Sequence, residues 1–468
     1  MFKMLDYYQG KTIFITGGSG FLGTALVHRI ATTIEFKHIY LLQRGGKSGL
    51  SGKWHRHLPF DTAQWLLDHP RITILDGDMM KPSLGLYADH IEMLKRNVHI
   101  IIHAASSINL AQRLQKIWPS VIRATEYAVE LGLQCDKLER FVYVSTAYTN
   151  THLCSLSLKG DVEMEERIVP LESTSPNNGN STVDEEYSEL QSRGSTKEYE
   201  SNDFPWGYVY AKHLSERLVT ERFTRHGKYD RLLILRPSVI GPAESFPYPG
   251  YAVPTSTPMT MIVALFVNHT AFSFELSSRL DDPESDSNLD EVPVDIVVDR
   301  LLAHLAYQTQ GCVHAVSGRK ARVFFREVEA AVYQLRWLPW RFRLTWVKEN
   351  GWNTEKSNAI SRLYKIFGTS FNFHEGKTEQ LMSKLSVEEK RTLRLFNTRK
   401  VGAFELVSRS KQMYDCSTIF ARKIAYPYRA FYQLLWIIWW VYVKLIVAWA
   451  GFDLRTVTRQ LFAGRKVH

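Results

Sequence analysis

The chain has 468 residues, which suggests two to four domains of about 100–200 residues each. Its 45% hydrophobic and 23% charged residues are typical of a globular protein and exclude disordered and fibrous classes. The net charge of +10 suits nucleic acid, an anionic membrane surface or a polyanionic small molecule, whereas the four cysteines form no CxxC pair and suit a reducing compartment without a metal site.

Short apolar strands alternate with helical patterns over residues 11–150, and the pattern resumes after residue 205. The expected strands are Thr12–Thr16, His38–Leu42, Ile72–Leu75, His99–His103, Arg140–Ser145 and Arg231–Arg236. Repeated alternation of this kind predicts an α/β fold with a Rossmann-type, doubly wound parallel sheet. No signal-peptide pattern precedes the first strand, so an intracellular protein is expected.

The first expected strand leads into a glycine-rich loop with the spacing GxxGxxG. Gly17 permits the tight turn, Gly20 lets backbone amides approach a pyrophosphate, and Gly23 allows close packing of helix and strand. The N-terminus of the next helix favours the phosphate anion. A dinucleotide site is therefore expected on the residues from the strand end to the helix start: Thr16, Gly17, Gly18, Ser19, Gly20, Phe21, Leu22 and Gly23.

The end of the second strand, Gln43-Arg44-Gly45-Gly46, carries no carboxylate. An acidic residue there would bind the ribose 2′-hydroxyl of NAD, whereas Arg44 can form a forked pair with a 2′-phosphate. This difference predicts NADPH as the cofactor. After the third strand, Asp78, with Met79 beside it, is expected either to accept a hydrogen bond from the adenine amino group or to cap its own loop.

A YxxxK motif places Tyr208 and Lys212 on one face of the expected helix Tyr208–His226. A free tyrosine titrates near pH 10, and a neighbouring ammonium lowers that pKa toward the range useful for proton transfer. Lys212 can also hold the nicotinamide ribose, so the pair is predicted to be catalytic. Tyr210 has Leu214 four residues later instead of a lysine, and is not expected to be catalytic.

Two hydroxyl residues, Ser145 and Thr146, end the strand that precedes this helix. At the carboxyl end of a parallel strand they would face the ligand crevice. Thr146 is therefore predicted to hydrogen-bond the substrate carbonyl, with Ser145 beside it; capping of a helix or turn is the alternative.

Residues 155–204 break the alternating pattern with twelve acidic and four basic residues, a net charge of −8. This composition predicts a solvated, flexible loop. The Rossmann domain, with an interleaved smaller substrate-binding region, is expected over 1–320, and a basic, helical domain over 321–425. The basic stretch 319–348 either attracts the phosphates of a ligand or is a solvated face.

The C-terminal segment 426–468 contains an apolar, tryptophan-rich run, residues 431–451, flanked by Arg and Lys. As a helix this run would be about 30 Å long, close to the thickness of a hydrocarbon core. Either it associates with a membrane, spanning it or lying in the interface, or it is a buried helix. Membrane association is the favoured prediction, and because no recognition module accompanies the basic residues, nucleic acid is not expected as a partner.

Beyond these motifs, the chain resembles the fatty acyl-CoA reductases, which are extended short-chain dehydrogenase/reductases with a male-sterility-type NAD-binding domain. The segments that carry the resemblance are the glycine loop, the YxxxK motif, Gly77–Leu86, His103–Ser106, Leu235–Pro242, Pro247–Tyr251, Val292–Asp295 and Val313–Ser317. They cover about residues 10–320.

The resemblance implies NADPH-dependent reduction of a fatty acyl-CoA through the aldehyde to a primary alcohol. It also implies that Tyr208 donates the proton, Lys212 assists it and Thr146 binds the carbonyl. Further residues that it places at the cofactor are Ala104, Ala105, Pro237, Ser238 and Val239. The implied location is a cytosol-facing catalytic domain on an intracellular membrane, the endoplasmic reticulum. Two alternatives stay open: a membrane-bound dehydrogenase or epimerase acting on a sterol or nucleotide sugar, and a non-catalytic cofactor-binding scaffold.

Overall fold

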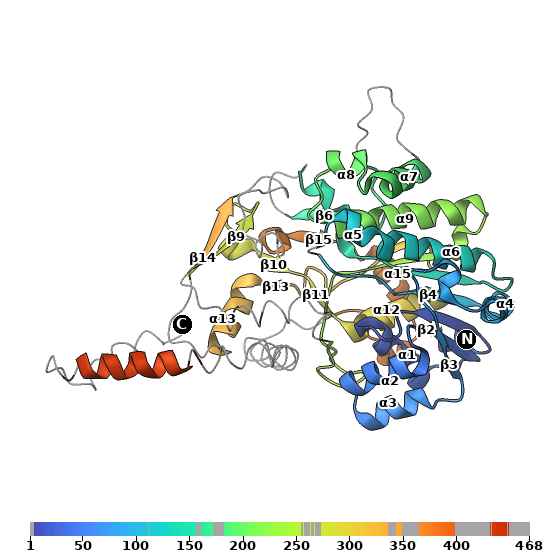
Figure 1. Cartoon of the computed structure of the whole chain (residues 1–468), viewed down its shortest axis with the longest axis horizontal. Helices are drawn as coiled ribbons and strands as arrows, with labels where there is room; N and C mark the ends of the chain where they lie inside the picture. Colours follow the sequence, from blue (N-terminus) through green and yellow to red (C-terminus); the bar gives the residue numbers. More distant parts are fainter. Residues whose placement is uncertain are drawn as a thin grey trace.

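The chain is built on a parallel sheet of seven strands in the order β12-β7-β5-β4-β1-β2-β3 (Figure 1). The computed structural model describes residues 4–110, 112–155, 161–171, 182–253, 256, 263, 266, 273–335, 343–348, 365–397, 431, 433–446 and 448. The sheet strands are β1 (Thr12–Thr16), β2 (His38–Gln43), β3 (Ile72–Asp76), β4 (Ile100–His103), β5 (Arg140–Val144), β7 (Leu232–Pro237) and β12 (Gly311–Ala315). The predicted Rossmann-type fold is confirmed, and each predicted strand begins and ends within one residue of the observed one.

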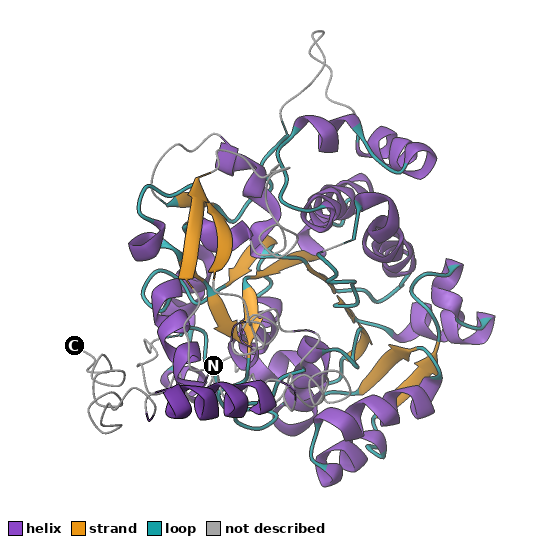
Figure 2. Ribbon diagram, turned by 60° about the vertical axis from the view of Figure 1, so that its left-hand side comes forward, coloured by secondary structure: helices purple, strands orange, loops and turns teal. Residues whose placement is uncertain are grey.

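Helices cover both faces of this sheet (Figure 2). Ile13 and Ile15 of β1 pack on one face and Phe14 on the other, because successive strand residues point to opposite sides. Since both faces are covered, the strands can be apolar throughout. The face of Ile13 holds α1 (Phe21–Thr33), α2 (Gly46–His57), α3 (Phe60–Leu67) and α12 (Val294–Ala306), and the face of Phe14 holds α4 (Ala88–Asn97), α5 (Leu114–Trp118), α6 (Ala124–Leu133) and α9 (Gly207–Arg225).

Four two-stranded sheets join chain segments that lie far apart in the sequence. They pair β6 (Val162–Met164) with β15 (Phe371–Phe373), β8 (Val239–Gly241) with β11 (Glu291–Pro293), β9 (Ser273–Ser278) with β14 (Arg343–Lys348), and β10 (Asn288–Leu289) with β13 (Val323–Phe324). Strands from beyond residue 320 thus pair with strands that precede it. The described helices of this later region are α13 (Phe325–Leu335), α15 (Gly376–Lys384) and α16 (Val387–Thr392).

The acidic segment differs from the solvated loop that its composition predicts. In its described parts, residues 161–171 and 182–204, it forms β6, α7 (Val183–Arg193) and α8 (Lys197–Ser201). Glu186 and Leu190 of α7 are buried. The prediction of a flexible loop is therefore wrong for these parts. Asp161, Asp184 and Glu186 form ion pairs with Arg322, Arg222 and Arg217, which lie elsewhere in the chain.

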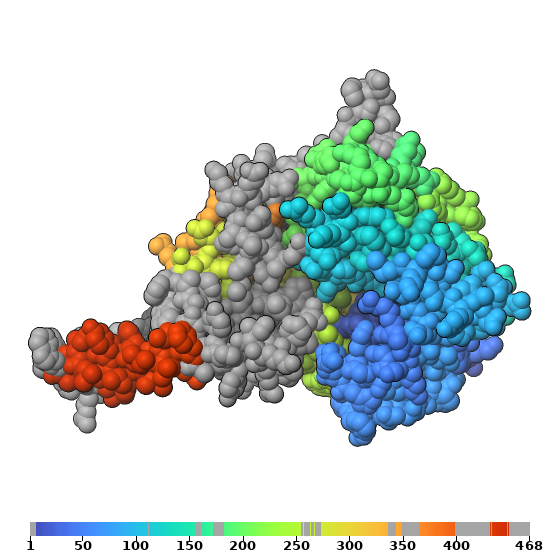
Figure 3. Space-filling model, viewed as in Figure 1, coloured from blue at the N-terminus to red at the C-terminus, as the bar shows by residue number. Residues whose placement is uncertain are grey.

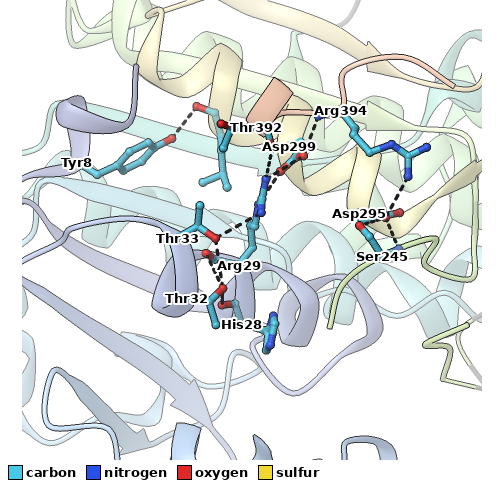
Figure 4. Close-up of polar contacts among 11 residues, drawn as sticks. Tyr8, His28, Arg29, Thr32, Thr33, Ser245, Asp295, Asp299, Thr392 and Arg394 are labelled. Atoms are coloured by element: carbon cyan, nitrogen blue, oxygen red, sulfur yellow. Dashed lines mark hydrogen bonds and ion pairs between the residues drawn. The ribbon is translucent and has the colours of Figure 1, made fainter. Parts of the chain in front are cut away.

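A polar network attaches the chain around residue 394 to the main domain (Figure 4). The guanidinium of Arg29 on α1 donates to both carboxylate oxygens of Asp299 on α12, at 2.9 and 3.3 Å, and to the carbonyl oxygen of Thr392 at 2.6 Å. The backbone N–H of Arg394 donates to the same carboxylate at 2.9 Å. The buried Asp299 thus joins α1, α12 and the segment after α16.

Residues 433–446 form a helix at one end of the long axis of the molecule (Figures 1 and 3). All of its described apolar side chains except Val443 are exposed, by 37% at Trp436 and up to 63% at Leu445. Within the described parts of the chain, no helix combines the length and apolar character needed to cross a membrane.

Candidate active site

The glycine loop lies where the strand order reverses, between the end of β1 and the start of α1. Gly17 has φ +79°, which favours glycine, and a Cβ on it would lie 2.7 Å from the backbone nitrogen of Ala105. A Cβ on Gly23 would lie 2.0 Å from the carbonyl oxygen of Gly17. The absence of a side chain at Gly17 lets the loop lie against the backbone of Ala105, and at Gly23 it lets α1 lie against the loop. Both glycines leave room in the crevice for a pyrophosphate at the N-terminus of α1.

A cavity of about 250 Å³ opens at the carboxyl ends of β1, β4, β5 and β7. Its walls bring together residues from Gly17 to Phe367, which lie far apart in the sequence. The predicted site residues that line it are Gly17, Gly20, Phe21, Leu22, Gly23, Ala104, Ser145, Thr146, Tyr208, Lys212, Pro237, Ser238 and Val239. The glycine loop and the YxxxK helix thus border one cavity.

Helix α9 presents Tyr208 and Lys212 to this cavity from its first two turns. Lys212 is 2% exposed, and its ammonium donates to the carbonyl oxygen of Val144 at 2.8 Å. Burial lowers the pKa of Lys212 to about 7. Burial also raises the pKa of the Tyr208 phenol, whereas the sequence argument predicts a lower value from its lysine neighbour. The tyrosine therefore stays protonated at neutral pH, as a proton donor must.

The two predicted hydroxyls lie at the end of β5, facing the same cavity. Ser145 is 6% exposed, and its Oγ has no hydrogen-bond partner among the described residues. The hydroxyl of Thr146 makes only long contacts, donating to the Pro237 carbonyl and accepting from the Tyr148 N–H, both at 3.4 Å. The Ser145 hydroxyl is thus free to hydrogen-bond a ligand oxygen, and the Thr146 hydroxyl can donate to one by giving up its long contact with Pro237.

A buried carboxylate fixes the loop that follows β7. The hydroxyl of Ser238 donates to Asp290 at 2.5 Å, and the backbone N–H groups of Ser317 and Gly318 donate to the same carboxylate at 2.8 and 2.9 Å. Asp290 therefore holds the cavity-lining loop against the loop after β12. Sequence analysis missed this aspartate, because only the fold brings its partners together.

Basic side chains gather beside the glycine loop at the end of β2. Arg44 is exposed there, as its predicted contact with a 2′-phosphate requires. Lys53 of α2 donates to the Ser19 hydroxyl at 3.1 Å. Burial and the charges of Arg44 and Arg56 lower the pKa of Lys53. Sequence analysis missed Lys53; the available signal was that α2 carries no acidic residue.

The remaining predicted residues lie near the cavity but outside its walls. Thr16 is buried, hydrogen-bonds His103 at 2.8 Å and accepts from the Ala105 N–H at 3.3 Å, which fixes the crevice between β1 and β4. Asp78 accepts from the Met80 N–H at 3.0 Å, which is the loop-capping alternative. Met79 packs against the core on the α9 side, and Gly18 packs against Leu41.

Large apolar side chains that sequence analysis did not identify complete the cavity. They are Ile108, Leu110, Tyr148, Trp206, Ile366 and Phe367. Trp206 directly precedes α9, so its position in the sequence was a usable signal. Ile366 and Phe367 reach the cavity from beyond residue 320, and nothing in the sequence indicated this contact.

Comparison with known proteins identifies relatives of one kind. A family model described as male sterility protein matches residues 15–301. Human fatty acyl-CoA reductase 1 is 25% identical over 320 residues, covering 66% of this chain, and human fatty acyl-CoA reductase 2 is 27% identical over 314 residues, covering 65%. The chain spans 56% of the length of each of these two relatives.

Solved structures show the same fold at low sequence identity. The terminal R domain of the myxalamid PKS-NRPS biosynthetic pathway matches with a TM-score of 0.57 and 18% identity, over 88% of this chain and 91% of that one. The epimerase Mth375 of Methanothermobacter thermautotrophicus matches with a TM-score of 0.53 and 16% identity, over 90% of this chain and 97% of that one.

Proposed function

Because the chain belongs to the male sterility protein family, we propose that it reduces a fatty acyl-CoA thioester with NADPH, through the aldehyde to a primary alcohol. The observation that carries the proposal is the one cavity shared by the glycine loop, the hydroxyls of Ser145 and Thr146, and Tyr208 with Lys212. The relatives named fatty acyl-CoA reductases support the choice of substrate.

The cavity's polar groups suit reduction of a carbonyl. A nicotinamide bound there would supply the hydride. The hydroxyl of Thr146 hydrogen-bonds the carbonyl oxygen, and Tyr208, which is protonated at neutral pH, stabilises the developing oxyanion and donates the proton when the aldehyde is reduced. Lys212 would hold the nicotinamide ribose, and in its protonated form it would favour negative charge nearby. Departure of the thiolate from the thioester yields the aldehyde.

The apolar part of the cavity suits a hydrocarbon chain. Ile108, Leu110 and Trp206 from one part of the fold, and Ile366 and Phe367 from another, form a wall without charge. Burial of methylene groups there contributes about 0.8 kcal/mol each, which favours a fatty acyl group over a sugar nucleotide.

Purified full-length protein tests the proposal directly. Mixed with NADPH and palmitoyl- or stearoyl-CoA, it is expected to oxidise NADPH and release a fatty alcohol, followed by absorbance at 340 nm and by gas chromatography. If no acyl-CoA of any length supports NADPH oxidation, the proposed reaction is wrong. Oxidation with a sterol or nucleotide sugar instead would favour the epimerase or dehydrogenase alternative.

The preference for NADPH over NADH is proposed to come from Arg44 and Lys53. Each charge-assisted hydrogen bond to a 2′-phosphate contributes about 1.5–3 kcal/mol. Arg44→Ala and Lys53→Ala are therefore each expected to raise the NADPH KM about 10- to 100-fold with little change for NADH. Lys47→Ala is the matched control, since Lys47 lies on the same helix but pairs with Asp68 at 3.0 Å. Equal effects on both cofactors would contradict this assignment.

The exposed helix of residues 433–446 is proposed to bind a membrane surface, with the catalytic domain on the cytosolic side of the endoplasmic reticulum. Its tryptophans and the net charge of +7 over residues 401–468 suit an anionic interface. The full chain is expected to float with vesicles containing phosphatidylserine, and Leu435→Glu with Trp439→Glu to abolish flotation. A fluorescent fusion spread evenly through the cytosol would contradict the location.

A further inference from the structure

Helix α9 has a second polar face, opposite the one that carries Tyr208 and Lys212. Tyr210, His213 and Arg217 are spaced three and four residues apart, which places them on one side of the helix. At 100° per residue this side lies about 140–200° from Tyr208, so these side chains point away from the cavity. Sequence analysis left this face without a role.

The acidic segment covers this face through a buried network. The guanidinium of Arg217 forms a fork with the carboxylate of Glu186 on α7, with one contact of 2.6 Å. The Tyr210 hydroxyl donates to the same carboxylate at 2.9 Å and also hydrogen-bonds Thr196. The Glu186 side chain is 1% exposed. Burying a carboxylate without a partner costs several kcal/mol, about the desolvation penalty of an ion. The hydrogen bonds from Arg217 and Tyr210 offset this cost, so they fix Glu186 against α9.

The chain just before α7 adds two more attachments to the same helix. The ring of His213 donates from Nε2 to the carbonyl oxygen of Val169 at 2.9 Å. Arg236 of β7 holds Glu216 of α9 in a fork, at 2.9 and 2.5 Å, and donates to the carbonyl oxygens of Glu165 and Arg167 at 3.3 and 3.0 Å. The described residues 165–171 and 182–196 therefore hold α9 over its first three turns, which include Tyr208 and Lys212.

We propose that the acidic segment clamps the YxxxK helix, and that Glu186 is the positioning residue through which it sets Tyr208 and Lys212 in the cavity. The inference rests on the proposed reductase function for its kinetic consequence. The buried carboxylate of Glu186 neutralises the Arg217 cation on the side of α9 behind Tyr208 and Lys212. Small displacements of a proton donor lower turnover strongly, whereas cofactor held by the glycine loop is little affected.

The test compares Glu186→Gln with Glu200→Gln in the full-length protein. Glu200 lies on α8 of the same segment, and its carboxylate is 51% exposed with only a 3.5 Å contact to Arg193. For Glu186→Gln we expect kcat, counted per NADPH-binding site, to fall about tenfold while the NADPH Kd changes less than twofold. Amides of residues 208–213 are expected to exchange with deuterium at least tenfold faster. Glu200→Gln should match the wild type in both measurements.

A second variant keeps the inference testable if Glu186→Gln does not fold. Tyr210→Phe removes only the hydroxyl and keeps the buried ring, and it should lower kcat about threefold with faster exchange over the same amides. A merely structural role would lower the number of NADPH-binding sites while leaving kcat per site unchanged, and that result would overturn the inference. If the wild type reduces no acyl-CoA, the proposed function fails, and the exchange comparison alone then decides whether the clamp exists.

Discussion

Tyr208→Phe is expected to lower kcat for acyl-CoA reduction about 1,000-fold while leaving NADPH binding nearly unchanged. The phenol lies in the cavity, and burial keeps its pKa high, so the wild-type side chain carries a proton at neutral pH. General-acid catalysis by a positioned group contributes about 10²- to 10⁴-fold, and phenylalanine removes it without changing the ring volume. The glycine loop and Arg44, which are proposed to bind the phosphates, are untouched. Stopped-flow measurement of NADPH oxidation and fluorescence titration of NADPH binding separate the two effects.

The matched control for this experiment is Tyr87→Phe. Tyr87 is 75% exposed, precedes α4 and is not part of the cavity lining, so loss of its hydroxyl should leave turnover unchanged. If Tyr208→Phe turned over like the wild type, Tyr208 would not be the proton donor. A wild type that binds NADPH without turnover on any substrate would instead favour the scaffold alternative.

The parts of the fold that the sequence predicted are those in which the signal is local. The run Thr12–Thr16 is buried throughout, with three apolar residues at its centre, because both faces of a central parallel strand are covered, and the glycines follow it directly. The YxxxK pair needs only the helical repeat to bring its two side chains to one face. Such features depend on neighbours within a few residues, so periodicity and spacing are sufficient to find them.

The parts that the sequence did not predict depend on pairing across long separations. The sequence analysis placed Glu186 in a solvated acidic loop. Its buried position could not be predicted, because its partner Arg217 lies 31 residues further along the chain, on α9. The apolar wall at Ile366 and Phe367 lies more than 150 residues beyond Tyr208 and comes from a region that was expected to form a separate helical domain. The pKa of Tyr208 is raised rather than lowered, because the residue spacing does not show the burial of the phenol.

The second large effect is expected from Gly23→Ala, which should weaken NADPH binding more than 100-fold and lower the melting temperature. An added Cβ would lie 2.0 Å from the Gly17 carbonyl oxygen and 2.7 Å from its carbonyl carbon, and neither backbone atom belongs to a flexible side chain that can move aside. That carbonyl also accepts the Gly20 N–H at 2.9 Å, so the whole loop must shift. Overpacking of this kind costs about 1–3 kcal/mol, and the shifted loop loses the close approach that a pyrophosphate needs.

Gly52→Ala separates this steric effect from the general effect of replacing a glycine by alanine. Gly52 lies inside α2, and a Cβ on it would meet nothing within 4 Å. Alanine is the better helix former by about 0.8–1.0 kcal/mol, so this variant should be slightly more stable than the wild type and should bind NADPH normally. Calorimetry and NADPH titration of the two variants together decide the point. Normal NADPH affinity in Gly23→Ala would mean that the pyrophosphate does not lie on this loop, and the assignment of the cofactor site would then be wrong.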